Sequence, residues 1–397
     1  MVDVSRAALP EHDSTSPEPP ASDSGGRPAS WRETFLLRVV SGQFAGITTG
    51  DWLALLGDNR YAVDRPYLLR AALVTLFSFG NSMLRCYENA VYGPRVRQTV
   101  VRSPLFILGH WRSGTTHLHN LFAVDRRLAY PNFYQVVFPH TFLCSEPIGA
   151  RLLALLVPKH RLGDNVAQSI RMPAEDEFAL CAATLRSPYL SWSFPRRAEY
   201  YDRYLTLRGV PGVEIDEWKE GLKWFLQKLT WKHRRPLVLK SPAHTCRIRL
   251  LLELFPDARF VHVHRNPYAV FSSVRRRHGR AAQYFRLQRS AAATDEMFIR
   301  RYVEMYDRFF AERPLIPAGR YQEIAFEDLE HDPLGQLREI YEKLDLPDFG
   351  AVEMPVREYV ASLSGYRKNE YRELPAALRS QIGSAWRRSF EEWGYSL

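Results

Sequence analysis

The chain has 397 residues, of which 46% are hydrophobic and 25% are charged, a composition typical of a globular protein with a substantial core. It excludes a mostly disordered or fibrous chain. Lys and Arg number 54 against 44 Asp and Glu, and the resulting net charge of +10 favours anionic partners: phosphorylated small molecules, nucleic acid or an acidic membrane surface.

The four cysteines form no C-x-x-C pair, so the sequence predicts neither a disulfide framework nor a zinc site. The longest apolar run, 71–79, is about half the length that a membrane span needs. The N-terminus is acidic and polar and lacks a secretory pattern. We therefore expect a soluble, cytoplasmic protein.

Three parts are expected along the chain. Residues 1–29 are rich in Pro, Ser, Asp, Glu and Gly and predict a disordered tail. Residues 30–100 contain apolar clusters at helical spacing and predict a helical N-terminal region that packs on the rest of the chain. Because Arg, Trp and Tyr flank its apolar stretch, peripheral contact with a membrane is an alternative for these helices.

Residues 101–397 predict an α/β domain. Short apolar runs bounded by turn signals alternate there with amphipathic stretches, which implies a mostly parallel sheet flanked by helices. Strands are expected at 105–108, 237–239, 260–263 and 321–326, and helices at 116–123, 244–255, 268–277, 294–310 and 334–344. We expect the segments 159–171 and 196–211 to be surface or lid elements. Sheets of this kind bind ligands beyond the carboxyl ends of their strands.

The most informative stretch is GHWRSGTT at 109–116, directly after the first predicted strand. Gly109 and Gly114 allow a tight turn that points successive backbone N–H groups toward one place. The helix that comes next begins with two threonines and adds unpaired N–H donors, while Arg112 supplies a fixed cation. Together these features predict a cradle for a phosphate group.

The spacing of the two glycines is similar to that of the nucleoside triphosphate P-loop, which needs Lys and then Ser or Thr after its second glycine. Here Thr115 occupies the place of the lysine, and the cation precedes the glycine at Arg112. This order argues against ATP and against magnesium-dependent chemistry. A P-loop-type nucleotide-dependent kinase or phosphotransferase is therefore the alternative rather than the preferred interpretation.

A second candidate anion site follows the third predicted strand. Arg265 comes at the carboxyl end of this strand, Pro267 begins the next helix, and Ser273 lies two turns into it. Arg265 and Ser273 can therefore converge on a second anionic group. The alternative is a surface arginine before a proline-capped helix.

These motifs resemble those of the sulfotransferases. The bacterial-type members have an Arg-Ser-Gly-Thr-Thr 5′-phosphosulfate loop, which is matched here by Arg112, Ser113, Gly114, Thr115 and Thr116. The segment from Arg265 to Ser273 resembles the 3′-phosphate site of the family. Arg367 and Lys368 are similar to the basic loop that closes over this phosphate, although Asn369 stands where the cytosolic pattern has Gly.

The resemblance covers about residues 103–395. It implies a P-loop-like α/β fold and the donor 3′-phosphoadenosine 5′-phosphosulfate (PAPS), with no metal. It further implies an alcohol, phenol or amine as acceptor. Small-molecule, carbohydrate, lipid and peptide hydroxyls all stay open, because acceptor specificity lies in loops. A nucleic-acid partner is not expected.

Two kinds of catalytic group are predicted. Sulfuryl transfer places negative charge on the oxygen that bridges to the leaving bisphosphate, so fixed cations and N–H donors at that oxygen should carry the catalysis. Arg112 and the loop N–H groups are the first candidates. Lys240 is the next, because it ends the second predicted strand and should emerge at the ligand edge of the sheet. It resembles a lysine of the tyrosylprotein sulfotransferases that assists at the transferred group.

The base that takes the acceptor proton has two candidates. His140 follows the second apolar stretch, where cytosolic sulfotransferases carry their catalytic His. The other candidate is a carboxylate of Glu175, Asp176 or Glu177, because adjacent carboxylates raise one another's pKa and tyrosylprotein-type enzymes use a Glu. This acidic cluster could also simply begin a helix.

Overall fold

The computed structural model describes residues 43–397 apart from 157–169, 284, 290–292 and 364–372. The predicted tail at 1–29, most of the segment 159–171, and both Arg367 and Lys368 lie outside the described residues.

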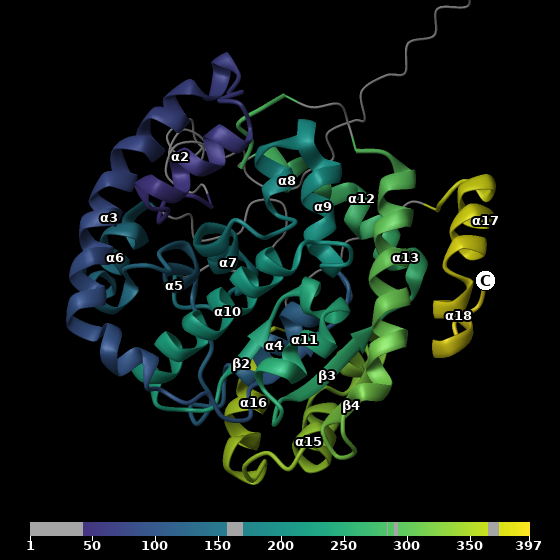
Figure 1. The fold of residues 1–397 in the computed structure, drawn as a ribbon. Helices are drawn as coiled ribbons and strands as arrows, with labels where there is room; N and C mark the ends of the chain where they lie inside the picture. The colour runs from purple at the N-terminus through teal and green to yellow at the C-terminus, as the bar shows by residue number, and fades with distance from the viewer. Residues whose placement is uncertain (1–42, 157–169, 284, 290–292, 364–372) are drawn as a thin grey trace, which may run out of the picture.

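A four-stranded parallel sheet lies at the centre of the fold, in the order β2-β1-β3-β4. All residues of the inner strand β1 are buried, because helices cover both faces of the sheet (Figure 1). The four predicted strands are confirmed as β1 (Leu105–Leu108), β2 (Val238–Lys240), β3 (Arg259–His264) and β4 (Tyr321–Ala325).

The parallel arrangement brings four chain segments to one edge of the sheet. Gly109 follows β1, Lys240 ends β2, Arg265 follows β3 and Phe326 follows β4. We call this edge the ligand rim. It lies at the carboxyl ends of the strands, where open α/β sheets bind their ligands.

Most of the helices predicted after the strands are confirmed to within a turn or two at their ends: α4 (Thr115–Phe122), α12 (Pro267–Gln283), α13 (Asp295–Glu312) and α15 (Pro333–Lys343). The single helix predicted at 244–255 is instead the 3-10 turn η3 (Pro242–Cys246) followed by α11 (Ile248–Leu254). The break falls at Arg247, which has φ −132° and ψ 23° and directs its guanidinium to a buried carboxylate.

The segment 196–211, expected to be a surface or lid element, is for the greater part a helix that is exposed on one side and packed into the core on the other. It contains η2 (Pro195–Arg197) and the helix α9 (Ala198–Thr206), which buries Tyr201, Tyr204 and Leu205 in the core. The remaining elements are α2 (Thr49–Asp58), η1 (Arg65–Tyr67), α3 (Leu68–Arg97), α5 (Phe133–Val137), α6 (Phe142–Leu156), α7 (Glu177–Thr184), α8 (Leu190–Ser193), α10 (Gly212–His233), η4 (Arg313–Leu315), α14 (Phe326–His331), α16 (Gly350–Ser362), α17 (Ala376–Ala385) and α18 (Arg387–Trp393).

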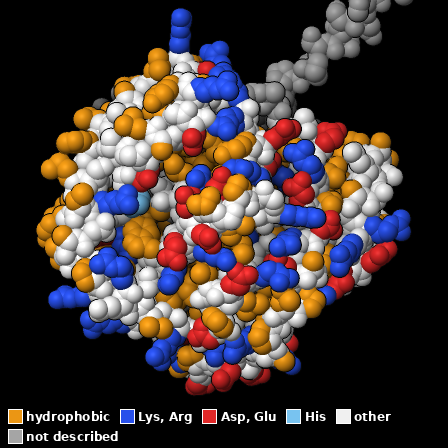
Figure 2. All heavy atoms as spheres, in the orientation of Figure 1, with side chains coloured by type: hydrophobic (Ala, Val, Ile, Leu, Met, Phe, Trp, Pro, Cys, Tyr) orange, Lys and Arg blue, Asp and Glu red, His pale blue; other side chains and the backbone are white. Residues whose placement is uncertain are grey.

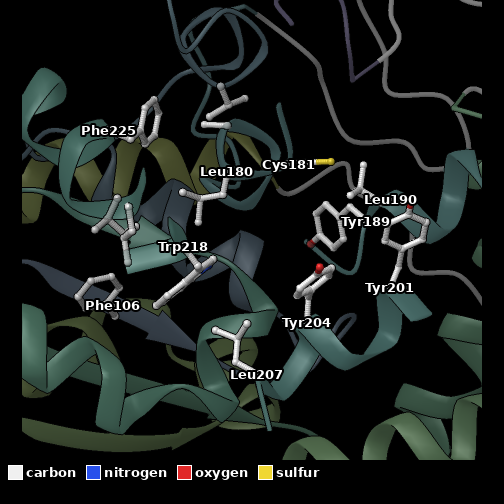
Figure 3. Close-up of a cluster of buried hydrophobic side chains, with 14 of the residues drawn as sticks. Phe106, Leu180, Cys181, Tyr189, Leu190, Tyr201, Tyr204, Leu207, Trp218 and Phe225 are labelled. Atoms are coloured by element: carbon white, nitrogen blue, oxygen red, sulfur yellow. The ribbon is translucent and has the colours of Figure 1, made fainter. Parts of the chain in front are cut away.

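The N-terminal helices and the sheet share one hydrophobic core. The largest cluster of buried apolar side chains extends from Phe44 and Trp52 to Phe260 and Phe390. Figure 3 shows part of it, where Phe106 of β1 lies in the same cluster as side chains of α7, α9 and α10. This core also contains the fully buried aromatic side chains from the sequence between residues 116 and 240, among them Tyr189 and Tyr204.

One helical stretch of the described residues, 65–97, is long and apolar enough by length and composition alone to cross a membrane. The sequence predicted no such stretch, because the apolar run at 71–79 is short. The structure continues the helix well beyond this run to Arg97.

Candidate active site

The turn between β1 and α4 depends on Gly109. Its N–H donates a hydrogen bond of 2.7 Å to Thr245 Oγ1, and its φ is +141°. A Cβ atom at this position would lie 2.6 Å from the carbonyl oxygen of Val263 in β3. The buried Ser113 donates its hydroxyl to the carbonyl of His110 at 2.9 Å, so this side chain fixes the shape of the loop from inside.

Gly114 begins α4 from a left-handed backbone conformation, with φ +100°. A Cβ there would lie 2.1 Å from the Phe326 ring, so only glycine lets the loop approach the start of α14 this closely. The residue makes no side-chain cap, and the first-turn N–H groups of a helix have no partner within the helix. The N-terminus of α4 is thus suited to hold an anion, which is what the cradle requires.

The two predicted anion sites adjoin each other on the ligand rim. Arg112 Nε donates to Ser273 Oγ of α12 at 2.8 Å, and Arg265 Nη1 donates to the carbonyl oxygen of Arg112 at 3.2 Å. The Arg265 guanidinium also lies over the Phe326 ring, 4.4 Å from its centroid. The structure therefore brings Arg112, Arg265 and Ser273 together, from segments that are far apart in the sequence.

Lys240 and Glu175 form an ion pair beside the loop. Lys240 Nζ lies 2.6 Å from Glu175 Oε1 and 3.4 Å from Thr116 Oγ1. Tyr189 donates its hydroxyl to Glu175 Oε2 at 2.5 Å and accepts a hydrogen bond of 3.1 Å from Trp111 Nε1. Burial raises the pKa of Tyr189 well above its usual value, so the phenol stays a donor. Lys240, Tyr189 and Trp111 thus hold the Glu175 carboxylate next to the cradle.

The other two members of the acidic cluster point into the protein. Asp176 is fully buried, lies 2.5 Å from His244 Nε2 and accepts a hydrogen bond of 3.0 Å from Ser241 Oγ. Burial raises the pKa of Asp176, but its interactions with His244 and Ser241 outweigh this, and the net shift is downward. Glu177 pairs with Arg247 at 2.8 Å, and both side chains are fully buried. The structure therefore supports a structural role for Glu177 and not the predicted catalytic one.

His140 lies among the helices of the N-terminal region rather than in the cradle. Its Nε2 is 3.6 Å from an Asp51 carboxylate oxygen of α2, and its ring centroid is 5.3 Å from that of Trp224 in α10. Burial lowers the pKa of His140 to about 3. Among the described residues, no contact joins His140 to the loop or to Lys240, so this arrangement favours Glu175 over His140 as the base.

Two residues of this site, Trp111 and Phe326, are absent from the sequence-based candidates, although both carried a usable signal. Trp111 lies inside the loop itself, and Phe326 directly follows β4, where the chain had to reach the ligand rim. Within the described residues, no group of three or more His, Cys, Asp or Glu side chains is arranged to hold a metal ion.

A model of the sulfotransferase family matches residues 104–350, which include the loop, Lys240, Arg265 and Ser273. The chain is also 37% identical over 374 residues to the omega-hydroxy-beta-dihydromenaquinone-9 sulfotransferases Stf3 of Mycobacterium bovis and Mycobacterium tuberculosis, covering 94% of this chain and 95% of each relative. The chain belongs to the sulfotransferase family. The predicted family and the predicted class of enzyme are thereby confirmed, and the kinase alternative is set aside.

Solved structures agree on the fold of this sulfotransferase. The sulfotransferase STF9 of Mycobacterium avium superposes with a TM-score of 0.61 at 21% identity, covering 79% of this chain and 82% of that one. STF1 of Mycobacterium tuberculosis superposes with a TM-score of 0.57 at 17% identity, covering 91% of this chain and 93% of that one. The predicted α/β fold with a parallel sheet flanked by helices is therefore confirmed.

Proposed function

We propose that this sulfotransferase transfers the sulfuryl group of PAPS to a hydroxyl group of a lipid-like acceptor. The observation that carries the proposal is the direct link between the two anion sites, in which Arg265 binds the backbone of Arg112 and Arg112 binds Ser273. A donor with a phosphosulfate at one end and a 3′-phosphate at the other needs two neighbouring cationic sites on one rim. PAPS, when bound, supplies an activated sulfuryl group attached to a bisphosphate that leaves readily.

The cradle residues bind and orient the donor in this proposal. The N–H groups at the start of α4 bind the phosphosulfate, and Arg265 and Ser273 hold the 3′-phosphate. Arg112, whose Nε donates to Ser273 Oγ, supplies positive charge between the two groups. Lys240, placed between Thr116 and Glu175, stabilises the negative charge that develops on the bridging oxygen. Fixed donors in a partly buried site need little reorganisation as this charge appears.

Glu175 is the base in this proposal. The ion pair with Lys240 presents it as a carboxylate, which is the form that accepts a proton, and Tyr189 fixes its orientation. As the acceptor oxygen forms its bond to sulfur, the bond from sulfur to the bisphosphate oxygen breaks. The hydroxyl proton passes to Glu175, so no further reactant is needed.

The acceptor class is supported by the relative Stf3, whose name gives omega-hydroxy-beta-dihydromenaquinone-9 as its acceptor and whose sequence aligns over nearly the whole of both chains. A cytoplasmic location is also part of the proposal. It is supported by the four cysteines, all of which are free thiols as expected in a reducing compartment.

Calorimetric titration with 3′,5′-bisphosphoadenosine tests the donor site. We expect binding in the micromolar range that weakens at least tenfold in Arg265→Ala, since one charge-assisted contact to phosphate is lost. Arg357→Ala is the matched control, because Arg357 pairs with Glu353 on α16 and should leave the affinity unchanged. Absence of binding, or equal affinity for ATP, would contradict the donor assignment. Transfer of label from PAPS to a panel of hydroxylated lipids and to water-soluble phenols then tests the acceptor class.

A further inference from the structure

The inner face of α3 is polar. Arg70, Ser78, Asn81 and Glu88 are buried, and their spacing places them on one side of the helix. Arg70 Nη1 donates to the carbonyl of Arg286 at 2.8 Å, and Asn81 Nδ2 donates to the carbonyl of Ala45 at 2.7 Å. Glu88 forms a buried ion pair with Lys228 of α10. Hydrogen bonds and an ion pair, rather than apolar contacts alone, thus attach α3 to the molecule.

The outer face of α3 is apolar. Seven of its large side chains are each more than half exposed: Leu68, Leu69, Leu76, Phe77, Phe79, Met83 and Tyr87. Between Arg70 and Arg85 the sequence contains no charged residue. Such a helix is the reverse of an ordinary surface helix, in which the apolar face is turned to the core. On an ordinary protein surface, exposed apolar side chains are scattered singly, whereas here they lie together along one helix. An exposed apolar patch of this kind marks a surface that binds a protein, a ligand or a membrane.

Helix α6 packs against α3 and exposes two further large apolar side chains, Ile148 at 71% and Leu152 at 59%. Figure 2 shows hydrophobic side chains gathered along the left edge of the molecule, where Figure 1 places α3. We call these seven residues of α3 together with Ile148 and Leu152 the α3 face.

The exposed charges at the two ends of α3 are positive. Arg65 lies before the helix, and Arg95 and Arg97 lie in its last turn, all three exposed. The only acidic residue of the helix, Glu88, is buried beneath it in the pair with Lys228. An apolar stripe with exposed arginines beyond both ends is complementary to a bilayer whose headgroups are anionic.

The same charges argue against the other possible arrangements. A second copy laid along the α3 face, parallel or antiparallel, would set arginines against arginines at both ends of the contact. A helix that crossed the bilayer would carry Arg70 and Glu88 into hydrocarbon and break their bonds to the rest of the molecule. Helix α3 thus has the composition for contact with lipid, but its inner face keeps it parallel to the membrane surface.

We propose that the α3 face docks this protein on the surface of a bilayer containing anionic lipids. Docking would bring the enzyme to an acceptor held in the bilayer, and this consequence alone rests on the proposed function. The geometry is favourable, since α6 packs on α5 and α5 packs on α7, the helix that starts two residues after Glu175. Binding to the bilayer itself depends on neither donor nor acceptor.

Co-sedimentation of the full chain with vesicles tests the docking. We expect the protein to pellet with vesicles of phosphatidylcholine and phosphatidylglycerol, more weakly with phosphatidylcholine alone, and less as salt is raised. The double variant Leu76→Glu/Met83→Glu should bind the anionic vesicles at least tenfold more weakly. Two exposed apolar side chains are replaced by carboxylates, which have the same negative charge as the lipid headgroups. Met354→Glu is the matched control, since Met354 on α16 is 60% exposed against 63% for Met83.

The affinity of the double variant for 3′,5′-bisphosphoadenosine and its transfer to a water-soluble acceptor should equal those of the native protein, which shows that it is folded and active. A native chain that stays in the supernatant, or a double variant that pellets as well as the native chain, overturns the docking proposal and leaves the proposed function intact. If the native protein is a dimer, the double variant is a monomer and neither binds vesicles, the α3 face is a contact between two copies. This outcome also overturns the docking proposal.

A second measurement uses the thiol at Cys86, which is exposed at the edge of the α3 face. An environment-sensitive fluorophore on this thiol, in a Cys144→Ser background, should shift its emission to the blue when anionic vesicles are added. Unchanged emission with vesicles that sediment the protein would show that another surface binds them, and would overturn the assignment to α3.

Discussion

Glu175 and Glu177 are separated by one residue, yet their carboxylates lie in different environments. Glu175 lies at the ligand rim between Lys240 and Tyr189, whereas Glu177 is fully buried against Arg247. A turn at the start of α7 directs the two carboxylates apart. Substitution of each by Gln preserves side-chain shape and removes only the charge, so the pair of variants separates chemistry from stability.

For Glu175→Gln we expect kcat to fall by about two to four orders of magnitude, the range that a general base contributes. The affinity for 3′,5′-bisphosphoadenosine should change little, because Glu175 is not among the residues proposed to hold the two phosphate groups. Steady-state kinetics with labelled donor measure the first quantity and calorimetry the second. A variant that keeps the native kcat would remove Glu175 as the base.

For Glu177→Gln we expect a loss of about 3–5 kcal/mol in the free energy of unfolding, because Arg247 is left as a buried charge without its partner. The variant that folds should keep the native kcat per folded molecule. Urea titration followed by circular dichroism gives the first value. A native stability combined with a collapsed kcat would reverse the roles of the two glutamates.

At the scale of elements, the cradle depends on how closely the start of α4 approaches the start of α14. Gly114→Ala would drive a Cβ into the Phe326 ring from a backbone with φ +100°. We expect the loop to shift and the affinity for 3′,5′-bisphosphoadenosine to fall at least tenfold, since the N–H donors lose their alignment. Gly50→Ala in α2 is the control, because a Cβ there meets nothing within 4 Å. Unchanged affinity in Gly114→Ala would mean that the start of α4 does not hold the donor.

The strands and the cradle could be predicted from the sequence because their signals are local. Apolar runs and glycine spacing fix β1 and the turn after it, and parallel strands bring their carboxyl ends to one rim. The division of roles in the acidic cluster could not be predicted. It depends on Tyr189, Arg247 and Lys240, which reach the cluster only in the folded chain. The polar residues Arg70, Ser78, Asn81 and Glu88 recur at helical spacing in the sequence. Their burial was not predicted, because an apolar helix usually packs its apolar side against the core.

At the scale of the whole molecule, buried neutral histidines should limit stability in acid. Burial lowers the pKa of His119 and of His140 to about 3, whereas an unfolded histidine titrates near pH 6.5. Below about pH 6.5 the unfolded chain therefore binds more protons than the folded one. The stability that these residues contribute is complete above pH 6.5 and is lost as the pH falls toward their folded values.

His140→Gln tests this linkage. We expect the slope of unfolding free energy against pH, measured by urea titration between about pH 6 and pH 4, to decrease by about 1.4 kcal/mol per pH unit, the value for one proton. His331→Gln, at an exposed residue, should leave the slope unchanged. The kcat of His140→Gln should stay within a few-fold of native, since His140 lies away from the cradle. An unchanged slope would indicate that His140 is protonated in the folded state.

The ion pair between Glu88 and Lys228 reaches across the boundary of the family match, because Glu88 precedes residue 104 and Lys228 follows it. Lys228 is itself buried, and burial lowers the pKa of its ammonium to about 8, so its charge depends on the Glu88 carboxylate. An enzyme shortened to the matched segment would lose Glu88, leave the buried Lys228 without its carboxylate partner and remove part of the shared core. The catalytic machinery of this protein is therefore not an excisable module, and engineering that replaces its amino-terminal helices must supply a substitute carboxylate or remove the lysine.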